Sequence, residues 1–144
     1  MTKPEAFWDA SALIPICTRQ PTTPSVHRLA AQFSCAVWWG SPVEIHSGIA
    51  RLLRTAEIDS EGKRQSLRAL AALCEGWNEI YPSELLREHA FNILATYPLR
   101  AADSLQLAAA LIWCNNKPTN RTFITADIRL ADAATLAGFT VITP

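Results

Sequence analysis

Four acidic residues, each placed where a predicted strand passes into a predicted helix, are the strongest candidates for chemistry in this chain. Asp9 ends the first predicted strand, and Asp127 follows a later one. Glu44 and Asp103 each lie in the first turn of a predicted helix. The carboxyl ends of parallel strands meet at one edge of a sheet, where ligands bind in open α/β folds. Carboxylates gathered there raise one another's pKa unless a cation is present, and oxygen ligands from several elements suit Mg²⁺ or Mn²⁺. The pattern therefore predicts a divalent-metal site.

Each of the four acids also has a purely structural interpretation. Asp9 and Asp127 are good N-cap residues, and Asp103 suits the positive end of a helix dipole. Ser41 and Glu44 have the spacing of a capping box, in which the Glu side chain reaches back to the N–H of the cap residue. Capping explains each acid singly but not the placement of all four at one expected edge. We therefore predict the metal site and keep capping as the alternative.

The elements that must position these acids alternate between short strands and helices. The predicted strands are 6–9, 35–39, 77–81, 122–125 and 139–143, and the predicted helices are 12–16, 26–33, one from Ser41, one from Ser60, 83–96, 101–114 and 128–137, the last ended by Gly138. Strands separated by helices imply right-handed crossovers and a parallel sheet covered on both faces. The predicted fold class is α/β, with a central parallel sheet of four to five short strands flanked by helices.

Apolar stripes with helical spacing predict which side of two of these helices is buried. The stripe of the helix from Ser41 consists of Ile45, Ile49, Leu52, Leu53 and Ala56. The inward residues expected in the helix from Ser60 are Leu67, Leu70, Ala71 and Cys74. A third helix is expected to be capped by Thr22 or Thr23 before it begins at residue 26.

Length and composition fit one globular domain, 1–144, since a chain of 144 residues buries roughly 70% of its unfolded surface. Lys plus Arg and Asp plus Glu are both 13, so the chain lacks the global positive field of a protein that coats nucleic acid, although a local basic rim is compatible with this balance. Its widely spaced cysteines form no zinc pattern and are expected to be reduced core thiols. No signal peptide and no apolar run of roughly 20 residues is found. We expect a soluble, cytoplasmic protein without a membrane segment.

Four short segments carry a resemblance to a known family. They are 7–13 (FWDASAL), 42–44 (PVE), 99–108 (LRAADSLQLA) and 125–130 (TADIRL). In this order and spacing they resemble the successive motifs of PIN-domain proteins, most closely the VapC-type toxins of bacterial toxin–antitoxin pairs, over essentially the whole chain. The resemblance implies a Rossmann-like PIN fold and a Mg²⁺- or Mn²⁺-dependent endoribonuclease. It also implies a homodimer and a cognate antitoxin whose C-terminal segment blocks the site.

The resemblance also assigns roles to individual residues. The family's acidic metal-binding quartet corresponds to Asp9, Glu44, Asp103 and Asp127, and its hydroxyl positions near the metal correspond to Ser11 and Thr125. A metal held by carboxylates polarises a phosphoryl oxygen and activates water for in-line attack, and a nearby carboxylate can accept the proton. The candidate contacts to RNA phosphates are Arg51, Arg54, Arg100 and Arg129. For any one of them, an ordinary charge on a solvated helix surface is the stronger interpretation.

Other functions fit the sequence less well. A receiver-type phospho-acceptor domain needs an acidic pair at the first strand and a lysine near the last, but no lysine follows Lys117. A haloacid-dehalogenase-type phosphatase needs a second Asp where Ser11 stands. The remaining alternative is a catalytically inactive PIN module that only binds a protein or RNA partner.

Overall fold

A five-stranded sheet with helices on both faces forms the protein in the computed structural model, which describes residues 2–144. The strands are β1 (Glu5–Trp8), β2 (Ser34–Trp38), β3 (Asn78–Ile80), β4 (Thr122–Ile124) and β5 (Thr140–Ile142). The helices are α1 (Ala10–Cys17), α2 (Thr23–Gln32), α3 (Ser41–Arg54), α4 (Ser60–Gly76), α5 (Glu84–Thr96), α6 (Ala101–Trp113) and α7 (Ile128–Ala137). The predicted α/β class is confirmed, and the sheet has five of the predicted four to five strands.

The sheet is entirely parallel, in the order β3-β2-β1-β4-β5. β1 is central, and it pairs with β2 through Phe7 and Ala36 and with β4 through Phe7 and Phe123. The chain therefore reverses its direction of winding at β1, which places the residues after β1, β2 and β4 next to one another. Such a switch point is where open α/β folds bind ligands.

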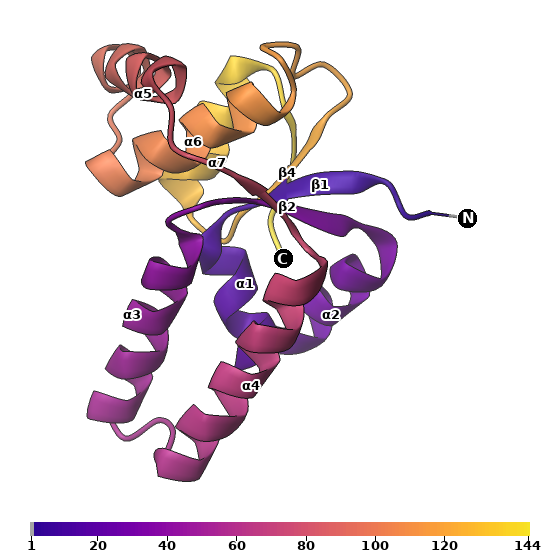
Figure 1. The fold of residues 1–144 in the computed structure, drawn as a ribbon, viewed down its shortest axis with the longest axis vertical. Helices are drawn as coiled ribbons and strands as arrows, with labels where there is room; N and C mark the ends of the chain where they lie inside the picture. Colours follow the sequence, from indigo (N-terminus) through magenta and orange to yellow (C-terminus); the bar gives the residue numbers. More distant parts are fainter. Residues whose placement is uncertain (1) are drawn as a thin grey trace.

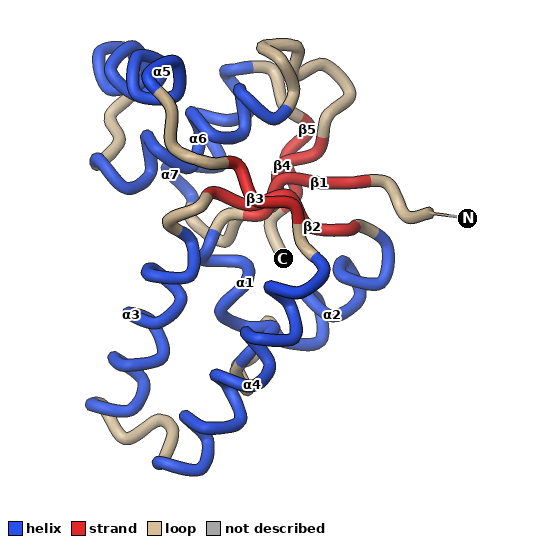
Figure 2. Tube along the Cα trace, in the orientation of Figure 1, coloured by secondary structure: helices blue, strands red, loops and turns tan. Residues whose placement is uncertain are grey.

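Two helical layers cover the sheet (Figures 1 and 2). Helices α5, α6 and α7 lie on one face, and α1 to α4 lie on the other, where α3 and α4 extend away from the sheet as a hairpin. Successive side chains of a strand point to opposite faces. Phe7 therefore enters the core under α6 and α7, whereas Ala6 and Trp8 enter the core under α1 and α3.

Some predicted helical details are wrong. Ala71 and Cys74 of α4 are exposed rather than inward, because α4 packs along only one side, against α1 and α3. Ala56 lies beyond the end of α3, exposed and with φ of 59°. Helix α2 begins at Thr23, three residues earlier than predicted, since Pro24 suits the first turn of a helix.

Other details agree with the sequence. Gly138 ends α7 with φ of 112°, a left-handed conformation that favours glycine. Cys17 and Cys114 are buried thiols, as expected, whereas Cys35 is half-buried. Within residues 2–144, no helix has the length and apolar character needed to cross a membrane.

Candidate active site

Asp9 lies at the centre of the site, directly after β1, and is only 3% exposed. It is the N-cap of α1, and its carboxylate accepts the backbone N–H of Ser11. The same Oδ2 atom accepts the hydroxyl of Ser11 and, at 2.8 Å, the hydroxyl of Thr125. A buried carboxylate requires such donors because it has lost its water. Asp9 is thus fixed by its own helix and by the strand beside it.

The two hydroxyls form a bridge between the ends of β1 and β4. Ser11 Oγ and Thr125 Oγ1 lie 3.2 Å apart. Ser11 Oγ accepts the N–H of Ala126 at 2.9 Å, and Thr125 Oγ1 accepts the N–H of Asp127 at 3.0 Å. The segment that carries Asp127 is therefore fastened to the segment that carries Asp9. The structure brings together both hydroxyl positions singled out in the sequence.

Asp127 is the N-cap of α7, as the structural alternative proposed. Its Oδ1 atom accepts the N–H of Leu130 at 2.9 Å. Capping and a place in the acidic cluster do not exclude each other, because a carboxylate has two oxygens and about four acceptor positions. For Asp9 and Asp127 the capping interpretation is confirmed, and it leaves carboxylate oxygens for a metal.

The predicted capping box at the start of α3 is wrong. The N-cap is Gly40, so that Ser41 is already the first helical residue. Glu44 Oε2 does not reach back to the cap but accepts the side-chain amide of Gln106 at 2.7 Å. Gln106 also donates to Ser41 Oγ at 3.0 Å. A hydrogen bond to α6 thus replaces the predicted contact between Glu44 and the helix cap. It joins Glu44 to the helix that carries Asp103.

The pKa of Glu44 depends on its burial and on the charges of other acids. Burial raises the pKa of Glu44 from its ordinary value of 4.5 to about 7. The hydrogen bond from Gln106 lowers this pKa, and the charges of Asp9 and Asp103 raise it. Asp9 caps α1 and Asp103 lies in α6, so the starts of three helices contribute to one electrostatic environment.

The pKa values of Asp9 and Asp103 are raised as well, chiefly by burial. Hydroxyl and backbone hydrogen bonds oppose the effect on Asp9, and the charge of Asp103 adds to it. The charge of Asp127 raises the pKa of Asp103, while Arg100 and Arg129 lower it. Asp103, in the first turn of α6, thus affects the pKa values of Asp9 and Glu44, and the charge of Asp127 affects that of Asp103.

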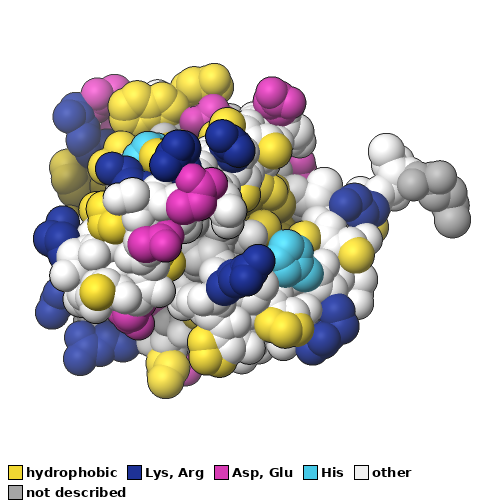
Figure 3. Space-filling view, turned by 90° about the horizontal axis from the view of Figure 1, so that it is seen from below, with side chains coloured by type: hydrophobic (Ala, Val, Ile, Leu, Met, Phe, Trp, Pro, Cys, Tyr) yellow, Lys and Arg dark blue, Asp and Glu magenta, His cyan; other side chains and the backbone are white. Residues whose placement is uncertain are grey.

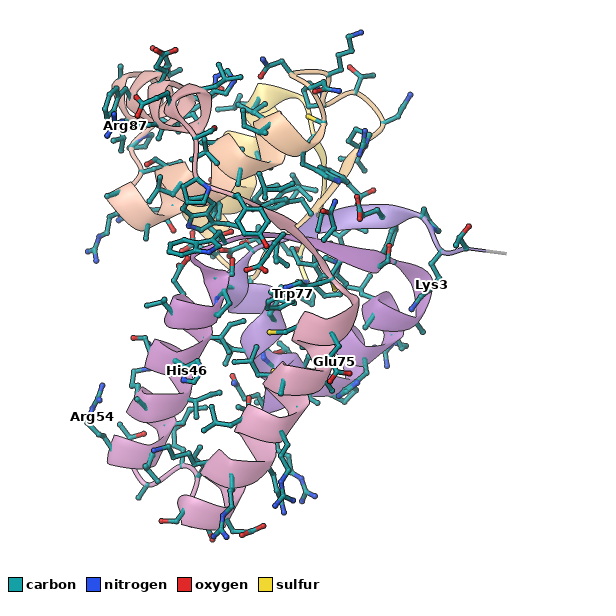
Figure 4. All side chains as sticks on the ribbon, in the orientation of Figure 1. Lys3, His46, Arg54, Glu75, Trp77 and Arg87 are labelled. Atoms are coloured by element: carbon teal, nitrogen blue, oxygen red, sulfur yellow. The ribbon has the colours of Figure 1, made fainter. Side chains whose placement is uncertain are left out.

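The predicted phosphate contacts fall into two groups. Arg100 and Arg129 are exposed and close enough to Asp103 to lower its pKa. Arg51 and Arg54 lie in the last turn of α3, at the far end of that helix from Glu44, and Figure 4 shows Arg54 projecting outward from the hairpin. On the face viewed in Figure 3, Lys and Arg side chains are interspersed with Asp and Glu. Of the four predicted arginines, Arg100 and Arg129 lie beside the acids.

The fold has solved relatives. VapC20 of Mycobacterium tuberculosis, a sarcin–ricin loop-cleaving toxin, superposes with a TM-score of 0.69 at 17% identity, covering 97% of this chain and 100% of its own. The fold is that of a VapC-type PIN domain. FitAcB of Neisseria gonorrhoeae has a TM-score of 0.65 at 18% identity, covering 94% of this chain and 96% of its own. A toxin–antitoxin complex from Klebsiella pneumoniae has a TM-score of 0.62 at 18% identity, with coverages of 85% and 87%. No protein-family model and no curated protein matches the sequence.

The donor set of this PIN fold suits a hard divalent cation. It consists of carboxylate and hydroxyl oxygens, the ligands that Mg²⁺ and Mn²⁺ prefer. The ion pairs within residues 2–144 join Arg64 to Glu61 and Arg87 to Glu84, so all four acids of the site are free of them. The four side chains are nevertheless spread out, and no three Asp, Glu, His or Cys side chains in the described chain form a closed set of metal ligands. Their chemistry fits a metal, and their coupled charges are what a bound cation would neutralise.

Gln106 is the residue that sequence reasoning missed. It lies within the segment that resembles the PIN motif, yet no role was assigned to it. The available signal was a long polar side chain in the apolar stretch from Leu105 to Ala110. In the structure it is fully buried. A buried amide in such a stretch requires polar partners, and those partners are Ser41 and Glu44.

Proposed function

We propose that this protein is a Mg²⁺- or Mn²⁺-dependent endoribonuclease and the toxin of a VapBC-type toxin–antitoxin pair. The observation that carries the proposal is the placement of four carboxylates at the starts of α1, α3, α6 and α7, beside the switch point of a PIN fold. The charges of neighbouring acids raise the pKa values of Asp9, Glu44 and Asp103, and Asp9 is held by the hydroxyls of Ser11 and Thr125. The sarcin–ricin loop-cleaving activity of the neighbour VapC20 supports RNA as the substrate.

The chain's own residues have distinct tasks in this reaction. The residues that would hold the metal are Asp9, Glu44, Asp103 and Asp127. A bound Mg²⁺ or Mn²⁺ would polarise a phosphoryl oxygen and activate water for in-line attack. Ser11 and Thr125 keep the Asp9 carboxylate in place before any substrate arrives. Arg100 and Arg129 bind the neighbouring RNA phosphates, and one of the four carboxylates accepts the proton of the attacking water.

Two protein partners are proposed, an antitoxin and a second copy of the chain. A cognate antitoxin would insert an arginine among the carboxylates, where a bidentate charge-assisted pair replaces the metal. The neighbouring Klebsiella pneumoniae structure is a toxin–antitoxin complex, which supports such a partner. Phe91 and Leu94, 60% and 42% exposed and three residues apart on α5, present an apolar face that supports a homodimer.

Cleavage of total RNA by the purified chain tests the enzymatic proposal. Cleavage is expected with Mn²⁺ or Mg²⁺, to stop in EDTA, and to be lost in Asp103→Asn. The matched control is Asp132→Asn, which removes an exposed acid from α7 outside the site and is expected to retain cleavage. If wild type and Asp103→Asn cleave equally, the activity does not come from this site. If neither cleaves, the inactive binding module is favoured.

Co-expression tests the partner. The short open reading frame beside the gene is expected to restore growth of cells that express the chain and to yield a protein that co-purifies with it. A chain that is harmless alone, monomeric and without a co-purifying partner would contradict the toxin assignment.

A further inference from the structure

Gln106 is a polar side chain at a position where the fold places apolar ones. It is 0% exposed, and its neighbours along α6, Leu107 to Ala110, are all buried hydrophobic residues. Burying an amide is unfavourable unless hydrogen bonds replace those it made with water. The burial of this amide therefore requires hydrogen-bond partners within the protein.

The two N–H groups of this amide bind two residues of one helical turn. Nε2 donates to Ser41 Oγ at 3.0 Å and to Glu44 Oε2 at 2.7 Å. Ser41 and Glu44 both belong to the start of α3, whereas Gln106 lies one turn beyond Asp103 on α6. The amide consequently ties together two helices that each supply one acid of the site.

The other half of the amide is left unused. Gln106 Oε1 is buried and has no hydrogen-bond partner among residues 2–144. An unmatched buried carbonyl is destabilising, so an apolar side chain would serve the core better. In the reverse orientation of the amide, Ser41 Oγ and Glu44 Oε2 would lose the N–H donor that both now accept. In the orientation that the structure adopts, Gln106 donates to Glu44 and leaves its own carbonyl without a partner.

We propose that Gln106 is a positioning residue for Glu44, an inference that rests on the proposed metal-dependent function. Glu44 has three rotatable side-chain bonds and is only half-buried, so without a donor its carboxylate would sample several rotamers. The hydrogen bond from Gln106 holds it in the orientation in which it couples to Asp9 and Asp103. Partners behind a ligand that act in this way change metal affinity or activity by about 10- to 100-fold.

Mn²⁺ binding to the full chain, measured by calorimetry in a double-mutant cycle, tests the inference. Gln106→Met keeps the length and shape of the side chain, removes the donor and also removes the unmatched carbonyl. It is expected to weaken Mn²⁺ binding by about tenfold or more. Thermal melting in EDTA measures separately the stability that Ser41 and Glu44 lose with their donor. In a Glu44→Ala background the same change is expected to have no further effect on Mn²⁺ affinity, because no carboxylate remains to be positioned. Ser66→Ala, which removes another buried hydrogen-bonding side chain, is the control and should leave the affinity unchanged.

Each outcome of this cycle is decisive. Wild type that binds no Mn²⁺ overturns the proposed function and with it this inference. Wild type that binds Mn²⁺ no better than Gln106→Met overturns the inference alone. An equal loss in both backgrounds shows that Gln106 acts on the core rather than through Glu44.

The wild-type chain provides a second measurement if Gln106→Met does not fold. The side-chain amide signals of Gln106 in NMR spectra are expected to exchange slowly with solvent and to shift when Mg²⁺ is added. Backbone N–H signals that shift at Ser11 while the Gln106 side chain stays unaffected would overturn the inference.

Discussion

Thr125 donates its hydroxyl to the carboxylate of Asp9 at 2.8 Å, although the two residues are 116 positions apart in the chain. The contact joins the ends of β1 and β4, which are neighbours in the sheet. The same oxygen accepts the N–H of Asp127. One buried hydroxyl therefore orients two acids of the site, without a contribution from metal or substrate.

Thr125→Val is expected to lower the free energy of unfolding by about 1–3 kcal/mol, because it keeps the shape of the side chain but leaves buried polar groups of Asp9 and Asp127 short of a partner. Thr125→Ser keeps the hydroxyl and loses only a methyl group, worth about 0.8 kcal/mol. Urea unfolding of both variants in EDTA measures the difference. A valine variant as stable as the serine variant would mean that the bridge contributes nothing.

Glu44→Gln is expected to change how stability depends on pH. The pKa of Glu44 is raised from 4.5 to about 7 in the folded protein, so the folded state binds a proton more tightly than the unfolded chain. Stability contributed by the protonated side chain is fully present below pH 4.5 and is lost as the pH rises through about 7. The metal-free variant should therefore match wild type near pH 4.5 and exceed it near pH 8.

Thermal melting in EDTA across this pH range measures the effect. The comparison between the two proteins removes contributions from groups that they share. A difference in melting temperature that is the same at every pH would contradict the raised pKa. The same variant should also need more Mn²⁺ for RNA cleavage, since an amide oxygen carries no net charge.

Asp103→Asn is expected to melt no lower than wild type in EDTA, since it removes a charge that raises the pKa of both Asp9 and Glu44. In saturating Mn²⁺ the order should reverse. A ligand that binds only the folded state adds about 2.7 kcal/mol at a hundredfold excess over its Kd, and the variant would lose most of this gain. Asp132→Asn, on the exposed side of α7, should behave as wild type. A wild-type melting temperature indifferent to Mn²⁺ and Mg²⁺ would contradict the metal site.

Local patterns predicted the elements of the fold and the acids that follow them. The alternation of short apolar strands with helices predicted the parallel sheet, and the position of Asp9 and Asp127 after strands predicted which edge they share. The order β3-β2-β1-β4-β5 was not predicted, because strand order depends on contacts between segments distant in the chain.

The errors have the same physical origin. Ser41 and Glu44 have the spacing of a capping box, but Gln106, more than sixty residues away, offers Glu44 a better partner. Periodicity likewise predicted Cys74 to be inward, whereas the side of α4 that is buried depends on where α1 and α3 pack against it. Local preference is decisive only where no tertiary contact competes with it.

Arg129→Ala is expected to raise KM for RNA cleavage and leave kcat nearly unchanged, because a phosphate contact away from the reacting group contributes equally to ground-state and transition-state binding. The residue is exposed and close enough to Asp103 to lower its pKa, which places it beside the acids. If it binds one phosphate, the dependence of log affinity on log salt concentration should become less steep by about 0.7 for single-stranded RNA. Arg100→Ala should behave in the same way, and the double variant should lose about twice as much slope.

Arg28→Ala is the matched control, since Arg28 is exposed on α2, the helix that leads into the amino end of β2 and thus lies at the opposite edge of the sheet. Removing its charge changes the net charge of the protein by the same amount without altering the rim of the site. KM and the salt slope of this variant should equal those of wild type. If all three arginine variants weaken RNA binding equally, net charge rather than a phosphate contact at the acidic site controls the affinity. If Arg129→Ala lowers kcat instead of raising KM, the guanidinium acts on the transition state itself, and its place would be at the scissile phosphate rather than beside it.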